Sequence, residues 1–214
     1  MDRARWFHLV TFLVAAFAIV LQLVLVIDGY AVIDDSTRPD TGTALIRFCS
    51  YLTIWSNVLV AWSTLTLALG RDRDSTWWRA LRLDAVVICF GGGVVHFFLL
   101  RPHLDHLYGW SIVADRFLHL VVPILAAVGW LRFGPRGRAQ RRDIGPFLVV
   151  PVAWLIYTLI RGPIVDWYPY PFIDVDQHGY PTVLATCVAI SVLMVGLAAG
   201  AVRLDRWLAA RQGP

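Results

Sequence analysis

The chain of 214 residues contains no lysine and no glutamate, so its side-chain charge rests on arginine, aspartate and histidine alone. Because cationic residues concentrate in the cytoplasmic loops of membrane proteins, arginine is here the only marker of which side a loop occupies. Cysteine is scarce as well. Cys49, Cys89 and Cys187 lie inside apolar runs, and their spacing fits no zinc or redox motif. We expect them to be small apolar core residues, and nothing in the sequence supports a disulfide.

Polar linkers and internal repeats are also absent, so residues 1–214 are expected to form one integral membrane domain. The hydrophobic fraction is 58% and the mean hydropathy is +0.63, well above the values of soluble domains. Six apolar runs approach the ~20 helical residues that cross ~30 Å of hydrocarbon. They are Phe7–Ile27, Phe48–Leu69, Leu81–Leu100, Ile112–Leu131, Ile144–Ile160 and Thr182–Leu204. The sequence therefore predicts an all-α bundle of six transmembrane helices.

The arginines are unevenly distributed among the gaps between these runs. Fourteen of the nineteen lie at the two chain ends or in and next to the second and fourth gaps, counting Arg82 and Arg203 in the end turns of their runs. By the positive-inside rule both termini are cytoplasmic, and the first, third and fifth loops face outward from the cell membrane. The first run is too long for the apolar region of a signal peptide, and no small-x-small cleavage site precedes Asp34–Asp35, so we count it as a span.

The basic balance, with a pI of about 9.2, is compatible in principle with nucleic acid. The arginines, however, lie on alternate loops rather than in one stripe, which favours anchoring to anionic lipid. We therefore expect the membrane and a lipid as partners and no nucleic acid. The sequence leaves the oligomeric state open.

Polar residues follow one face of the second run. Ser50, Thr53 and Asn57 are three and four residues apart, which places them on one side of a continuous helix, and Thr64 extends the stripe. Small hydroxyl and amide side chains often join membrane helices by hydrogen bonds, so packing is one explanation. Function is the other, because polar groups in hydrocarbon are costly and usually face the bundle interior.

The fourth run contains an acid and a base one helical turn apart. Asp115 and His119 are i and i+4, so the carboxylate can fix the tautomer of the imidazole and leave its second nitrogen free as a base. Pro123 cannot donate to the carbonyl of residue 119, which predicts a kink and a freed carbonyl at that point. His96 in the third run and Thr53 in the second are expected at a similar depth, about 6–10 Å below the outer end of each span.

The histidines have two alternative interpretations. A metal site from His96, His103, Asp105 and His119 has suitable ligand types but no HxxxH or HExxH spacing. Paired intramembrane histidines can also hold haem or a lipid-soluble redox group. We expect neither a metal nor a cofactor. Near the cytoplasmic end of the third run, we expect Asp84 to pair with Arg82 or Arg79.

The fifth loop, residues 162–181, is rich in proline, aromatic residues and aspartate. Its prolines oppose both helix and central strand, so it is expected to be non-helical. Two interpretations remain open: a stiff cap on the outer mouth of the bundle, or an ordered connector.

Together, the motifs Tyr-Leu-Thr53-Ile-Trp-Ser-Asn57 and Asp115-Arg-Phe-Leu-His119-Leu-Val-Val-Pro123 resemble the androgen-induced, FAR-type integral membrane hydrolases. The fifth loop, with Tyr-Pro-Tyr-Pro-Phe-Ile-Asp174 and Gly-Tyr180-Pro, resembles their bacterial six-span relatives in particular. In the animal members an intramembrane threonine is the nucleophile and a histidine its partner, and they cleave esters of hydroxy fatty acids. The resemblance implies Thr53 and His119 as that pair.

The leading hypothesis is therefore a membrane-embedded hydrolase of a lipid ester. Thr53 would attack the acyl carbon, His119 would accept its proton, and Asp115 would orient His119. We expect Asn57, Ser56 and His96 beside the substrate, with Asn57 or Ser56 donating to the oxyanion. The alternative is a non-enzymatic membrane protein, such as a proton or small-molecule pathway or a lipid-binding accessory protein. In that case Asp115, His119 and His96 would form a polar relay or a metal site.

Overall fold

The computed structural model describes residues 2–30, 39–104 and 107–211, and within these ranges it is all-α and contains no strand. The α-helices are α1 (Arg3–Ile27), α2 (Thr41–Ser50), α3 (Leu52–Ala68), α4 (Thr76–Val95), α5 (Trp110–Arg116), α6 (Val122–Phe133), α7 (Ile144–Phe147), α8 (Val149–Val165) and α9 (Val175–Arg211). Two turns are π-helical: η1 (His96–Leu100) continues α4, and η3 (Phe117–Val121) joins α5 to α6. Three 3-10 turns are η2 (Arg101–His103), η4 (Arg141–Asp143) and η5 (Pro171–Ile173).

Five helical stretches are long and apolar enough to cross a membrane, or six if the bent pair of α2 and α3 is one span. The second predicted run was expected to be one continuous helix from Phe48 to Leu69, and that expectation is wrong. The helix breaks at Tyr51, whose backbone is extended, and α2 and α3 meet at 69°. The break was invisible in the hydropathy pattern because apolar residues continue on both sides of it.

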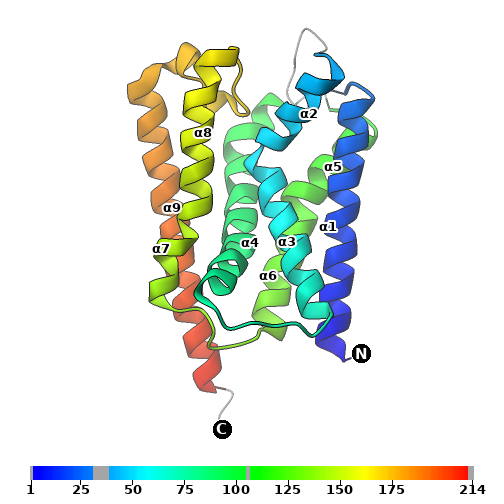
Figure 1. Cartoon of the computed structure of the whole chain (residues 1–214), viewed down its shortest axis with the longest axis vertical. Coiled ribbons are helices and arrows are strands. Elements are labelled where there is room, and N and C mark those ends of the chain that lie inside the picture. Colours follow the sequence, from blue (N-terminus) through cyan, green and yellow to red (C-terminus); the bar gives the residue numbers. More distant parts are fainter. Residues whose placement is uncertain (1, 31–38, 105–106, 212–214) are drawn as a thin grey trace.

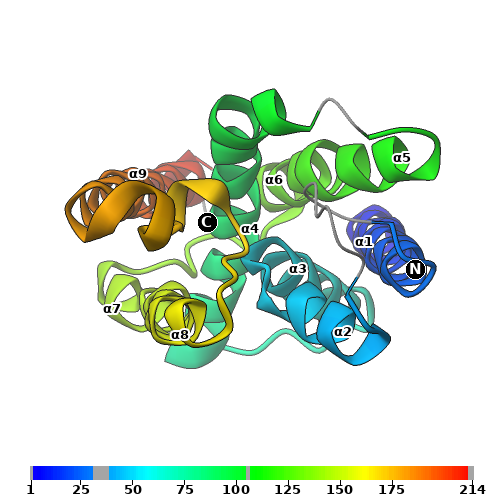
Figure 2. The ribbon, with the colours of Figure 1, turned by 90° about the horizontal axis from the view of Figure 1, so that it is seen from above.

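Helix α4 lies in the middle of the bundle and packs against α3, α6 and α9 (Figure 2). Helix α1 packs along α3, and its buried positions include Thr11, Ala15 and Ala18, whose small side chains allow close approach. Helices α7, α8 and α9 form the other side of the molecule (Figure 1). The start of α1 and the end of α9 lie at the same end of the bundle.

The outer faces of the long helices expose large apolar side chains. Examples are Phe17 of α1, Ile156 and Ile164 of α8, and Val188 and Val192 of α9, exposed by 45%, 54%, 76%, 63% and 68%. A band of this kind is stable against hydrocarbon and costly in water. It is compatible with a multi-pass membrane protein.

The expectation that residues 162–181 are non-helical holds only for their centre. Helix α8 continues through Pro163 to Val165, and α9 already begins at Val175, with a break at Gly179 (φ 72°). Pro181 lies just after the break, where the first turn of a helix tolerates proline, whereas Pro163 in the last turn of α8 removes one i→i−4 hydrogen bond. Residues 166–174 connect the two helices, and they fold inward, since Tyr170 and Ile173 are buried.

At the end of the bundle that carries the chain termini, an arginine clamps two loops together. The guanidinium of Arg79 donates to both carboxylate oxygens of Asp143, at 2.9 and 3.1 Å, and to Asp74 at 2.7 Å. The expected pairing of Asp84 with Arg79 or Arg82 is therefore wrong. Arg82 donates to the carbonyl of Gly134, and neither carboxylate oxygen of the buried Asp84 has a hydrogen-bond partner.

Candidate functional site

Thr53, His119 and Asp115 form one chain of contacts across two helices. The Thr53 hydroxyl oxygen lies 3.2 Å from His119 Nε2. His119 Nδ1 lies 3.0 Å from Asp115 Oδ1 and 3.1 Å from the Asp115 backbone oxygen. A hydroxyl, an imidazole and a carboxylate in this order match the nucleophile, base and orienting group of covalent hydrolases.

The contacts on Nδ1 determine the tautomer of His119. Both neighbours of Nδ1 are oxygen acceptors, so Nδ1 must carry the proton and donate it to Asp115. Nε2 of the neutral ring is then an acceptor. It faces the hydroxyl of Thr53, which donates to it. This is the protonation state in which His119 can accept the threonine proton.

The break at Tyr51 places Thr53 at the N-terminus of a helix. Thr53 is the second residue of α3, and its N–H has no acceptor within the helix, as for the first four residues of any helix. Ser50 lies before the break, on α2, and donates to the carbonyl of Ile46. The spacing had predicted that Ser50, Thr53 and Asn57 share one continuous helical face. This prediction is wrong for Ser50.

His96 and His119 lie in the π-helical turns η1 and η3, and such turns are rare and often occur at functional sites. The turn η3 lies just before Pro123, which affects its hydrogen bonding. The i→i+5 bonding of this turn leaves the Leu118 carbonyl facing Pro123, which has no N–H to donate. The side-chain amide of Asn57 donates to that carbonyl instead, at 3.3 Å. The predicted irregularity near His119 thus takes the form of a π turn, and the carbonyl that faces Pro123 and accepts from Asn57 is that of Leu118 rather than that of residue 119 as predicted.

His96 lies against the back of this pair. Its ring stacks on that of His119, with centroids 3.8 Å apart and planes inclined by 8°. Nε2 of His96 lies 3.4 Å from Asp115 Oδ1, the same oxygen that accepts from His119. Gly93 makes this approach possible, because a Cβ built there would lie 2.6 Å from the carbonyl oxygen of His119.

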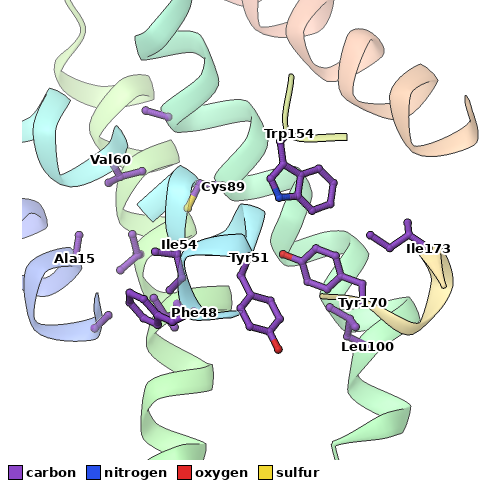
Figure 3. Packing of buried hydrophobic residues seen from close by; sticks show 14 of the residues in the cluster. Ala15, Phe48, Tyr51, Ile54, Val60, Cys89, Leu100, Trp154, Tyr170 and Ile173 are labelled. Carbon is purple, nitrogen blue, oxygen red and sulfur yellow. The ribbon is translucent and has the colours of Figure 1, made fainter. Parts of the chain in front are cut away.

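Tyr170 completes the site, although the sequence did not predict this residue there. Its hydroxyl accepts from the N–H of Thr53 at 3.2 Å and lies 3.2 Å from the Thr53 hydroxyl oxygen. With the Thr53 hydrogen directed to His119, Tyr170 donates to Thr53 Oγ1. Burial raises the pKa of Tyr170 above its ordinary value, partly offset by its hydrogen bonds to Thr53, so the hydroxyl keeps its proton. Figure 3 shows its ring between Trp154 and Leu100.

Ser56 and Asn57 lie one turn further along α3. Ser56 donates its hydroxyl to the carbonyl of Thr53, and the Asn57 amide donates to the same carbonyl at 2.8 Å. Ser56 lines a cavity, whereas Asn57 is fully buried. The donors that were expected to face an oxyanion are thus used on backbone carbonyls.

Two cavities meet at Thr53 and His119. The first, called here the apolar cavity, lies between α3, α4, α8 and α9; its walls include Leu52, Ile88, Gly92, Val152, Leu155, Ile190 and Met194. The second, called the polar cavity, lies toward α1, α2 and α5, and is lined in part by Gln22, Ser111 and Asp115. Tyr170 borders both cavities. The reactive groups therefore separate an apolar compartment from a more polar one.

Some of the side chains that were expected to form a metal site do lie close together. His96, Asp115 and His119 each offer one ligand atom, and these atoms lie within 4.8 Å of one another. The side chain of His103 and all of Asp105, which were expected to join them, lie outside the described part of the chain. Imidazole and carboxylate suit zinc or iron, and three such ligands leave room for a water.

Comparisons with known proteins found no matching family model, no matching curated protein and no matching solved structure.

Proposed function

We propose that the protein is a membrane-embedded hydrolase of lipid esters, with Thr53 as nucleophile and His119 as base. The observation that carries the proposal is the pair of contacts on the two nitrogens of His119: 3.2 Å to the Thr53 hydroxyl and 3.0 Å to Asp115. A membrane threonine is a poor nucleophile unless a base removes its proton, and this arrangement supplies the base in the required tautomer. The resemblance to the androgen-induced, FAR-type hydrolases points to the same two residues.

The reaction has two balanced halves. Thr53 Oγ1 attacks the acyl carbon while its proton moves to His119 Nε2, and the imidazolium is stabilised by Asp115. The alcohol leaves with that proton, which restores neutral His119 and leaves the acyl group on Thr53. Water then attacks the acyl-threonine with His119 as base, and the fatty acid is released as Thr53 regains its proton.

The oxyanion of each step would form beside Tyr170 and the N-terminus of α3. Tyr170 brings a protonated hydroxyl to within 3.2 Å of Thr53 Oγ1. The Thr53 N–H, now bonded to Tyr170, belongs to a helix N-terminus, whose dipole favours negative charge. Removing one such donor costs about 10²- to 10³-fold in kcat in other hydrolases. We assign the oxyanion role to Tyr170 in preference to Ser56 and Asn57.

The two cavities support hydrolysis of a lipid. The apolar cavity offers a path for an apolar substrate, while the polar cavity offers Gln22, Ser111 and Asp115 to a water molecule. Thr53 and His119 border both, so ester and water can approach from different sides.

We further propose that α2 and α3 form one broken span, giving six spans with both termini in the cytoplasm and the site toward the outer leaflet of the cell membrane. The arginine distribution supports this orientation. Broken helices are tolerated at membrane depth where they line a cavity, and residues on both sides of the break, Phe48 and Thr53, border the polar cavity.

The test is labelling of the purified protein in detergent by a fluorophosphonate, which reacts with activated hydroxyl nucleophiles. The wild type and Thr53→Ser should be labelled, whereas Thr53→Ala and His119→Ala should not, with all four proteins eluting as monodisperse species. Equal labelling of the wild type and Thr53→Ala would overturn the assignment.

A metal-binding or relay protein is the second candidate, because the ligand atoms of His96, Asp115 and His119 lie within 4.8 Å of one another. Elemental analysis separates the two. Stoichiometric metal that disappears in His96→Ala, without fluorophosphonate labelling of the wild type, favours the metal protein. Labelling that survives a chelator favours the hydrolase.

A further inference from the structure

The apolar cavity is more extensive than the chemistry at Thr53 requires. Along α4 its wall runs from Val95, next to His96, back to Ile88, seven residues and therefore about 10 Å. Apart from the hydroxyls of Thr53 and Tyr170 at the reactive end, the described residues bring only those of Ser56 and Ser191 to this wall. An almost wholly apolar cavity beside a nucleophile matches a hydrocarbon chain.

The cavity also reaches the lipid-facing surface. Its walls include Val152 of α8, which is 46% exposed, and Ser191 of α9, which is exposed as well. These two helices lie next to each other on the outside of the bundle (Figure 1). Ile88 and Met194, at the far side of the cavity, are buried. A hydrocarbon chain can therefore pass from the bilayer between α8 and α9 without crossing water.

Three consecutive glycines of α4 differ in what surrounds them. A Cβ on Gly91 would meet the sulfur of Met194 at 2.6 Å, and one on Gly93 would meet the His119 carbonyl at 2.6 Å. A Cβ on Gly92 would meet nothing within 4 Å, and Gly92 lines the apolar cavity. Gly92 is one helical turn from His96, so a side chain there would fill the cavity close to the reactive atoms.

We propose that the apolar cavity holds the acyl chain of the ester, which enters between α8 and α9, and that Gly92 keeps the cavity open to long chains. This inference rests on the proposed function for its chemistry but not for its binding site. The acyl carbon lies at Thr53, the chain runs past Gly92 toward Met194, and the alcohol faces the polar cavity. The substrate class is accordingly an ester of a long-chain fatty acid.

Binding is tested without turnover in the Thr53→Ala protein, using a palmitate analogue with a diazirine in its chain and mapping the crosslinks by mass spectrometry. Crosslinks are expected at cavity residues such as Leu155, Ile190 and Met194. They should be lost when Gly92→Leu is added. The matched control is Gly200→Leu on α9, where a Cβ also meets nothing within 4 Å but which does not line the cavity.

Turnover is tested with 4-nitrophenyl butyrate and 4-nitrophenyl palmitate. Gly92→Leu should lower kcat/KM for palmitate about tenfold or more relative to butyrate, because overfilling a packed space is destabilising for the longer ligand. Gly200→Leu should leave the ratio unchanged. Melting temperatures in detergent verify that both variants are folded.

The two proposals fail in different ways. Crosslinks that depend on Gly92, in a protein that hydrolyses neither ester, would retain the acyl site and remove the hydrolase. Hydrolysis with an unchanged chain-length ratio in Gly92→Leu would overturn the acyl site and retain the hydrolase. Crosslinks confined to exposed residues of α8 and α9 would also overturn it.

Discussion

Gly93 of α4 lies directly against the backbone of His119, so close that a Cβ at residue 93 would lie 2.6 Å from the His119 carbonyl oxygen. That approach allows His96, one turn further along, to stack on the His119 ring. The position of His119 thus depends on the absence of a side chain on the neighbouring helix.

Gly93→Ala is therefore expected to displace His119 from Thr53. The new methyl group must move the facing backbone by nearly 1 Å, and misplacement on that scale costs up to about 10²-fold in rate. We expect hydrolysis of a short-chain ester to fall about 10- to 100-fold. Gly200→Ala on α9 is the matched control, because a Cβ there meets nothing within 4 Å and the residue does not line the apolar cavity, and its rate should equal that of the wild type. Equal rates for the two alanine variants would contradict the account.

Tyr170→Phe removes one hydroxyl and leaves the ring packing in place. Thr53 then loses a donor to its oxygen and the acceptor of its N–H. We expect kcat to fall about 10²-fold with little change in KM, as for other oxyanion donors. Tyr157→Phe is the control, because its hydroxyl lies 3.2 Å from Ser50 Oγ, outside the reactive group. A rise in KM without a fall in kcat, or an equal fall in kcat in both variants, would assign Tyr170 to packing.

The clamp at the end of the bundle that carries the termini predicts an effect on stability without one on chemistry. Asp143→Asn leaves the buried guanidinium of Arg79 with only the exposed carboxylate of Asp74, and breaking a buried pair typically costs about 3–5 kcal/mol. Asp74→Asn removes the exposed partner of the same guanidinium and should have a much smaller effect. Thermal unfolding in detergent measures both. Similar melting temperatures for the two variants would show that Asp143 contributes no more than its exposed counterpart.

The proposed orientation predicts which loops are accessible from outside the cell. In a variant without its three native cysteines, Asp166→Cys should react with a membrane-impermeant maleimide on intact cells. Arg138→Cys, in the arginine-rich loop, should react only after the cells are opened. The reverse pattern would contradict the proposed orientation, because it would place the termini outside the cell and the site toward the inner leaflet.

The sequence predicted those parts of the site that are encoded locally. The i and i+4 spacing of Asp115 and His119 was sufficient to predict their contact, and Pro123 marked the irregular turn. The depth of Thr53 and His96 in their spans suggested that these two residues lie at the level of His119. Their adjacency could not be predicted, because it depends on which helices are neighbours.

Contacts between distant segments had no such signal. Tyr170 is 117 residues from Thr53, and the composition of its loop indicated only an ordered connector or a cap. The break at Tyr51 lies within a continuous apolar run, so hydropathy could not reveal it. Asp84 was expected to pair with Arg82 or Arg79 on its own helix, but Arg79 donates to both carboxylate oxygens of Asp143, which is 64 residues away in the sequence.

If Thr53 is an activated nucleophile, peptide mass spectrometry of the fluorophosphonate adduct should identify it as the residue that reacts. We expect the adduct on Thr53 in the wild type and on the substituted serine in Thr53→Ser, and its loss in His119→Ala. An adduct on Ser56, Ser111 or Tyr170, or no adduct at all on a folded protein, would contradict the assignment of Thr53 as the nucleophile.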